Sequence, residues 1–78
     1  MIQPTILIVD DDVAICQILA KILKRENYDI HQAHTAAAAL QIFSDNAVDA
    51  VLLDMMLPDD DGINVAKLML QDKPTVPI

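Results

Sequence analysis

The chain has 78 residues, enough for one small domain, and 54% of them are hydrophobic although only 3% are aromatic. Its formal net charge of −7 disfavours binding to nucleic acids and to anionic membrane surfaces. The single cysteine excludes an internal disulfide bond, and no apolar run approaches the roughly 20 residues that cross a bilayer. We therefore expect a cytoplasmic domain that binds neither a membrane nor nucleic acid directly.

The first half of the chain predicts two strands, each followed by a helix. Residues 6–9 form a continuous apolar run, which is typical of a strand covered on both faces. Asp12 is the expected N-cap of a helix with apolar residues at helical spacing, namely Ile15, Ile18, Leu19, Ile22 and Leu23. Residues 28–34 alternate enough for a short strand. Thr35 is the expected N-cap of an alanine-rich helix whose apolar stripe consists of Ala36, Ala39, Leu40 and Phe43.

The second half predicts one more strand and one more helix. Residues 50–53 are again fully apolar and end at Asp54, and residues 56–62 contain the proline, the aspartates and the only glycine of a loop. Helical spacing returns at Gly62, with Ile63, Ala66 and Leu70 expected on one side. Strands that alternate with helices indicate parallel pairing, so the predicted fold class is α/β with a three-stranded parallel sheet.

Acidic residues follow two of the three predicted strands. Asp10 and Asp11 come after the first strand and Asp54 after the third. The carboxyl ends of parallel strands lie at one edge of the sheet, so these side chains meet if the strand order is 2-1-3. Their mutual repulsion would be relieved by a proton or a cation, and an all-oxygen site suits Mg²⁺. A carboxylate beside Mg²⁺ can act as the nucleophile of phosphoryl transfer.

The segments ILIVDDD (6–12) and AVLLDMMLPDDDG (50–62) carry a family resemblance along the whole chain. With their spacing, they resemble the CheY-like receiver domain of two-component response regulators. The match includes a proline four residues and a glycine eight residues after Asp54. The resemblance implies a flavodoxin-like fold of five strand-helix pairs, of which this chain holds the first three. It also implies a phosphorelay module rather than a turnover enzyme.

The resemblance assigns roles to four positions. Asp54 matches the phospho-accepting aspartate, which takes its phosphoryl group from a sensor histidine kinase. Asp11 and Asp54 match direct Mg²⁺ ligands, and the backbone carbonyl of Met56 matches the third. Asp10 matches the acid that holds a metal-bound water.

The chain also departs from the family pattern. The family's hydroxyl residue after the fourth strand, its lysine after the fifth strand, and its last two helices are absent, so residues 1–78 are interpreted as a partial receiver domain. The third strand would then have a bare edge, and bare apolar edges recruit partners. We therefore expect a homo-oligomer formed through that edge.

The sequence is also compared with two other functions that use some of the same features. A truncated, signalling-incompetent fragment could act as a structural piece that self-associates or completes a partner. An unrelated aspartyl-nucleophile phosphatase is disfavoured, because such enzymes need a second acid at the position of Met56.

The remaining polar and sulfur side chains have simpler expected roles. Asp61 is the expected N-cap of the last helix, and Asp59 and Asp60 are expected in a solvated loop. The histidines at positions 31 and 34 are expected on the surface without zinc, and Cys16 is expected to be inert and at least half-buried.

Overall fold

Strands and helices alternate along the chain, as the apolar pattern predicts. The computed structural model describes residues 3–78. The elements are β1 (Thr5–Val9), α1 (Val13–Arg25), β2 (Asp29–Ala33), α2 (Ala36–Asp45), β3 (Ala50–Leu53) and α3 (Gly62–Asp72). All six predicted elements are therefore confirmed.

The strands form one parallel sheet in the order β2-β1-β3. Leu7 in the middle of β1 lies between His31 of β2 and Val51 of β3. The predicted α/β class and the 2-1-3 order are thus confirmed, and β1 and β3 end side by side. This edge of the sheet is where the acidic residues follow.

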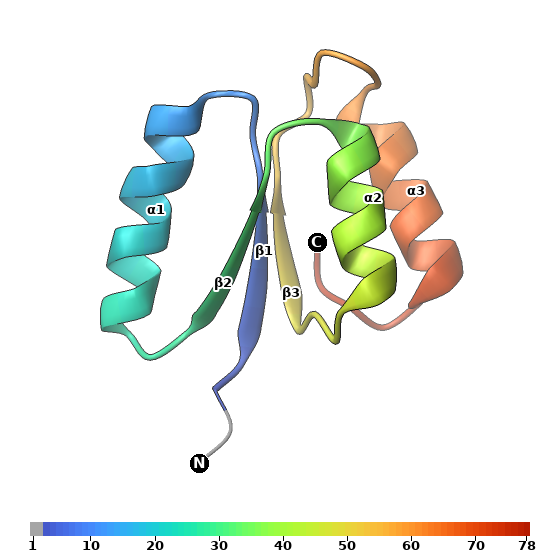
Figure 1. Ribbon diagram of the computed structural model, residues 1–78. Coiled ribbons are helices and arrows are strands. Elements are labelled where there is room, and N and C mark those ends of the chain that lie inside the picture. The colour runs from blue at the N-terminus through green and yellow to red at the C-terminus, as the bar shows by residue number, and fades with distance from the viewer. Residues whose placement is uncertain (1–2) are drawn as a thin grey trace.

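Helices cover both faces of the sheet, with α1 on one side and the pair α2 and α3 on the other (Figure 1). Ile6 and Ile8 of β1 pack toward α1, whereas Leu7 and Val9 pack toward α2 and α3. This alternation follows from the two-residue period of a strand. It explains why the run of residues 6–9 is apolar at every position.

The buried face of α1 differs from the predicted one. Cys16 and Ala20 are the buried residues of the helix, with Leu19 and Leu23 partly buried beside them. Ile18 is 59% exposed, because the predicted apolar stripe is wider than the part of α1 that contacts the sheet. Small residues at the contact let the helix approach β1 closely, and the isoleucines are left on its outer surface.

The apolar stripe predicted for α3 does not mark its buried side. Val65 and Met69 are fully buried one helical turn apart, and they pack with α2 and the sheet. Ile63 and Leu70 of the predicted stripe are 57% and 41% exposed. Apolar residues lie on both sides of this helix, so periodicity alone does not identify the buried side.

A lysine from the end of α3 closes the end of α2. The Lys73 ammonium donates hydrogen bonds to the carbonyl oxygens of Phe43 and Asn46, each at 2.6 Å. It also lies 4.7 Å from the centre of the Phe43 ring. Carbonyl groups in the last turn of a helix lack partners within the helix, so Lys73 satisfies one of them and ties α3 to α2.

The last residues of the chain return to the sheet. The Val51 N–H donates to the Pro77 carbonyl oxygen at 2.9 Å, so residues 76–78 start to line the outer edge of β3. The expectation of an entirely bare edge is therefore wrong at this position, although Leu52 is still 45% exposed. Within residues 3–78, none of the helices has the length and apolar character needed to cross a membrane.

Candidate functional site

Three carboxylates meet at the edge of the sheet where β1 and β3 end. Oxygen atoms of Asp10, Asp11 and Asp54 all lie within 4.8 Å of one another. Asp10 and Asp54 are half-buried, and Asp11 is exposed. The predicted convergence is therefore present, because the two strands are neighbours and end at the same level.

Backbone hydrogen bonds fix the two acids that directly follow strands. The Asp10 N–H donates to the Ala33 carbonyl oxygen at 3.1 Å, and the Asp54 N–H donates to the Val9 carbonyl oxygen at 2.9 Å. Each acid thus continues the pairing of its strand by one residue. The positions of their side chains are set by the sheet and not only by the loops that follow.

The neighbouring aspartate, Asp12, has a structural role. Its carboxylate accepts a hydrogen bond from the Ile15 N–H at 3.2 Å, which is the predicted N-cap of α1. The Asp12 N–H in turn donates to the Asp10 carboxylate at 2.9 Å. Asp12 therefore starts the helix and helps to orient Asp10.

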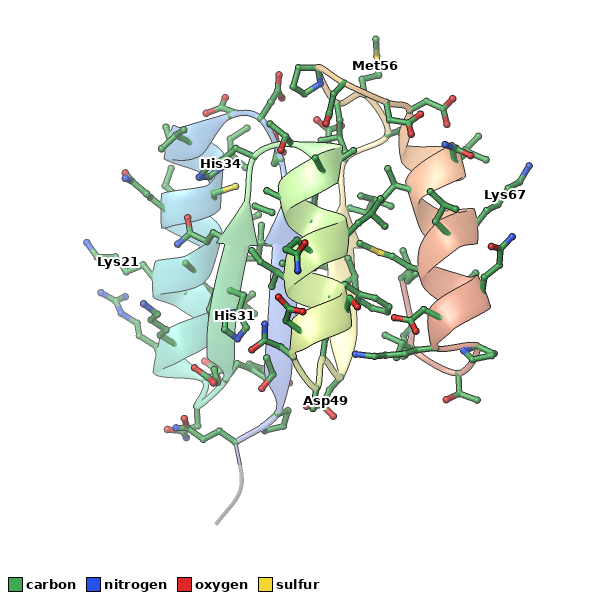
Figure 2. The ribbon with its side chains drawn as sticks, turned by 45° about the vertical axis from the view of Figure 1, so that its right-hand side comes forward. Lys21, His31, His34, Asp49, Met56 and Lys67 are labelled. Atoms are coloured by element: carbon green, nitrogen blue, oxygen red, sulfur yellow. The ribbon has the colours of Figure 1, made fainter. Side chains whose placement is uncertain are left out.

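The loop after β3 brings the Met56 backbone close to Asp54. The Met56 N–H donates to the Asp54 carboxylate at 3.3 Å, and Met56 forms an isolated backbone bridge with Asp61. The Gly62 N–H closes the loop by donating to the Met55 carbonyl oxygen at 2.8 Å. The Met56 side chain points away from the molecule in Figure 2 and is 81% exposed. Any contribution of Met56 to the site therefore comes from its backbone.

Two of the three aspartates in this loop accept hydrogen bonds from N–H groups at the starts of helices. Asp61 caps α3 by accepting from the Asn64 N–H at 2.7 Å, as predicted. Asp59 was expected to be only solvated, but its two carboxylate oxygens accept hydrogen bonds from the N–H groups of Ala36 at 2.7 Å and Ala37 at 3.0 Å. These hydrogen bonds lower the pKa of Asp59. The only sequence hint is that α2 has no acid in its own first turn.

Two further side chains contact the backbone of Asp10. Nδ1 of His34 lies 3.0 Å from the Asp10 carbonyl oxygen, and the Cys16 thiol donates to the same oxygen at 3.4 Å. Burial, followed by the negative charge of Asp10, raises the pKa of the Cys16 thiol. Cys16 is buried, as predicted. His34 is half-buried, so its expected surface position is only partly right (Figure 2).

An open groove of about 320 Å³ begins at two of the acids and runs between α1 and β3. Its walls consist of Ile8, Val9, Asp10, Leu19, Leu52, Leu53 and Asp54. Carboxylate oxygens at one end with access to solvent are the donor set that Mg²⁺ prefers, because this ion keeps several water ligands. The site therefore has the donor set for a hard divalent cation.

The chain is similar to known proteins over almost its full length. The response regulator receiver domain family model matches residues 6–78. The transcriptional regulatory protein SrrA of Staphylococcus aureus is 41% identical over 70 residues, which are 90% of this chain and 29% of that protein. The chain therefore spans less than a third of the length of this relative.

Solved structures show the same arrangement of strands and helices. A CheY-like receiver domain protein from Methanospirillum hungatei superimposes with a TM-score of 0.92 at 33% identity, over 94% of this chain and 58% of that one. The response regulator protein TrrA from Thermotoga maritima, solved in complex with Mg²⁺ and BeF, gives a TM-score of 0.88 at 33% identity, over 92% of this chain and 63% of that one. The predicted flavodoxin-like fold is confirmed, and the chain belongs to the response regulator receiver domain family of two-component signal transduction.

Proposed function

We propose that this chain is a phospho-acceptor module, in which Asp54 takes a phosphoryl group from a phosphohistidine of a sensor histidine kinase. The observation that carries the proposal is the meeting of Asp10, Asp11 and Asp54 within 4.8 Å where β1 and β3 end. Three carboxylates so close repel one another unless a proton or a cation joins them. Membership of the receiver family supports a signalling role for this site rather than metabolic turnover.

The donor set fits Mg²⁺. In the proposal, the carboxylates of Asp11 and Asp54 and the backbone carbonyl of Met56 hold the ion, and Asp10 holds one of its water ligands. When bound, Mg²⁺ supplies positive charge that offsets the carboxylates and the incoming phosphoryl oxygens. The Mg²⁺ and BeF complex of the Thermotoga maritima relative supports Mg²⁺ as the ion.

The transfer itself requires one bond exchange at phosphorus. A carboxylate oxygen of Asp54 forms a bond to phosphorus as the P–N bond of the phosphohistidine breaks. The electron pair of that bond stays on the imidazole, which then takes up a proton from solvent. Attack by a carboxylate oxygen releases no proton, so the transfer needs no general base.

The test is Asp54-dependent phosphorylation. The wild-type chain and Asp54→Asn are incubated with Mg²⁺ and acetyl phosphate, and the intact mass of each is recorded over time. Asp60→Asn is the matched control, because it removes one charge from the same loop without changing Asp54. We expect a phosphoryl adduct on the wild type and on Asp60→Asn, and we expect no adduct to form on either when EDTA removes the Mg²⁺. An adduct on Asp54→Asn, or none on the wild type, would refute the proposal.

We further propose that residues 1–78 are part of a receiver domain and that the uncovered side associates with a second copy of the chain. β3 is an edge strand, and the Leu52 side chain on it is 45% exposed. Exposed apolar strand edges are sites of association. This surface also favours the alternative function, a structural piece that self-associates.

Sedimentation velocity at micromolar concentration tests the association. We expect Leu52→Lys to shift the wild-type oligomer toward monomer, because it places a charge on the edge strand. Ile63→Lys is the control, since Ile63 is 57% exposed on α3, on the opposite face of the sheet. A compact wild-type monomer would exclude the proposed association.

A further inference from the structure

The loop that follows β3 is connected to α2 by one side chain. Both oxygens of the Asp59 carboxylate are used, one by the Ala36 N–H at 2.7 Å and one by the Ala37 N–H at 3.0 Å. The Thr35 hydroxyl accepts from the next free N–H group, that of Ala38, at 3.1 Å. The first N–H groups of a helix have no partners within the helix, so Asp59 completes a set that Thr35 alone would leave unsatisfied.

The other polar contacts of this loop are local. The Leu57 N–H donates to the Asp60 carbonyl oxygen at 3.2 Å, and the Met56 N–H donates to Asp54 at 3.3 Å. These bonds, with the Gly62 N–H to Met55 carbonyl hydrogen bond and the Met56–Asp61 bridge, hold the loop to the end of β3 and the start of α3, but none of them reaches α2. The Leu57 side chain packs against the core, but an apolar contact has little directional preference. Asp59 thus supplies a directional link to a separate element, 22 and 23 residues away in the sequence.

The start of α2 is itself attached to the acidic site. The residues just before it contact Asp10, since the Ala33 carbonyl accepts the Asp10 N–H at 3.1 Å and His34 Nδ1 lies 3.0 Å from the Asp10 carbonyl. The start of α2 is therefore hydrogen-bonded on two sides. The residues before it contact Asp10, which follows β1, and its first N–H groups bind Asp59 in the loop that carries Met56.

We propose that Asp59 is a positioning residue for the phospho-acceptor site. By holding its loop against the first turn of α2, it keeps the Met56 backbone at a fixed place relative to Asp10 and Asp54. This inference rests on the proposed function and adds to it a residue that does not touch the ion or the phosphoryl group. Asp59 keeps the Mg²⁺ ligands in the binding geometry. Its loss should therefore lower Mg²⁺ affinity and slow phosphorylation when Mg²⁺ is limiting.

Substitution of Asp59 should weaken Mg²⁺ binding more than it changes the fold. For Asp59→Ala we expect about tenfold weaker binding, at the lower end of the range for residues that support metal ligands. Phosphorylation should slow at low Mg²⁺ and recover at saturating Mg²⁺. Asp59→Asn should fall in between, because its single carbonyl oxygen can accept one of the two hydrogen bonds while its NH₂ group cannot accept the other.

Two controls separate positioning from charge and from helix stability. Asp60→Ala removes the same charge from the same loop, but Asp60 bonds to the Asp61 N–H and the Asn64 amide and not to α2. Thr35→Ala weakens the start of α2 without changing the loop. Mg²⁺ affinity is measured by titration of the Met56 amide signal in NMR spectra, and each variant is checked by thermal unfolding.

The inference is supported if Asp59→Ala loses more Mg²⁺ affinity than either control variant and Asp59→Asn loses less than Asp59→Ala. If Asp59→Ala does not fold, the Asp59→Asn variant alone decides by its affinity relative to Asp60→Ala. Equal affinities for the Asp59 variants and Asp60→Ala, or an equal loss in Thr35→Ala, would overturn the inference and leave the proposed function intact. Failure of the wild type to bind Mg²⁺ would overturn both.

Discussion

Replacement of Gly62 by alanine should damage both the fold and the site, because this glycine lies against the backbone that directly follows β3. An added Cβ would lie 2.6 Å from the Asp54 carbonyl oxygen and 2.6 Å from the Met55 Cα. Ordinary contacts begin near 3.4 Å, so the two backbone segments would have to separate by about 0.8 Å. Such overpacking costs roughly 1–3 kcal/mol. The better helix propensity of alanine returns at most about 1 kcal/mol.

The net loss of unfolding free energy should therefore be about 1–2 kcal/mol, which corresponds to a fall in Tm of several degrees for a domain of this size. Thermal unfolding by circular dichroism measures the loss, and intact mass after incubation with acetyl phosphate and Mg²⁺ measures Asp54 phosphorylation. Lys67→Ala is the control, because Lys67 lies on the exposed side of the same helix (Figure 2). Stability and phosphorylation of Gly62→Ala equal to those of this control would refute the steric argument.

Three further predictions concern other contacts. Lys73→Met should lower the free energy of unfolding by about 1–2 kcal/mol in urea titrations, because the α2 carbonyls lose a charged donor while the stem over Phe43 is kept. The Asp59 hydrogen bonds lower the pKa of this carboxyl in the folded state, so their contribution is present above the unfolded value near 3.8 and is lost as pH falls through the folded value. The stability difference between wild type and Asp59→Ala should accordingly narrow below about pH 4 in urea unfolding. Native Cys16 should react with a thiol reagent only at the rate of unfolding, since it is buried and its pKa is raised.

The strands and the acidic residues that follow them could be predicted because both depend on short, local patterns, whereas the 2-1-3 order is implied by the family resemblance. The runs at residues 6–9 and 50–53 are apolar at every position, which is typical of a strand covered on both faces. Each run ends in aspartate, and the parallel arrangement brings these ends together. The N-caps Asp12 and Thr35 were also predictable, since each accepts from an N–H only three residues away.

The parts that could not be predicted depend on distant partners. Asp59 and Lys73 satisfy the two ends of α2 from 22 to 30 residues away, and no local pattern indicates which helix end such a side chain will reach. The sequence does not identify the buried faces of α1 and α3, because both helices carry apolar residues on more than one side. Small or flexible residues such as Cys16 and Met69 occupy the actual contacts, whereas the larger Ile18 and Ile63 remain outside.

The available N–H groups decide what each aspartate of the site can do. Asp59 accepts two backbone N–H groups and Asp12 accepts one at the start of a helix, so both are committed to structure. Asp10 and Asp54 each accept one N–H from the second residue after them, which orients the carboxylate but leaves oxygen capacity free. The exposed Asp11 carboxylate accepts none from residues 3–78, so it has the most capacity for a cation. Adjacent aspartates thus acquire different roles because the backbone around them differs. The carboxylates with spare oxygen capacity, those of Asp10, Asp11 and Asp54, are the three proposed to bind Mg²⁺ directly or through a water ligand.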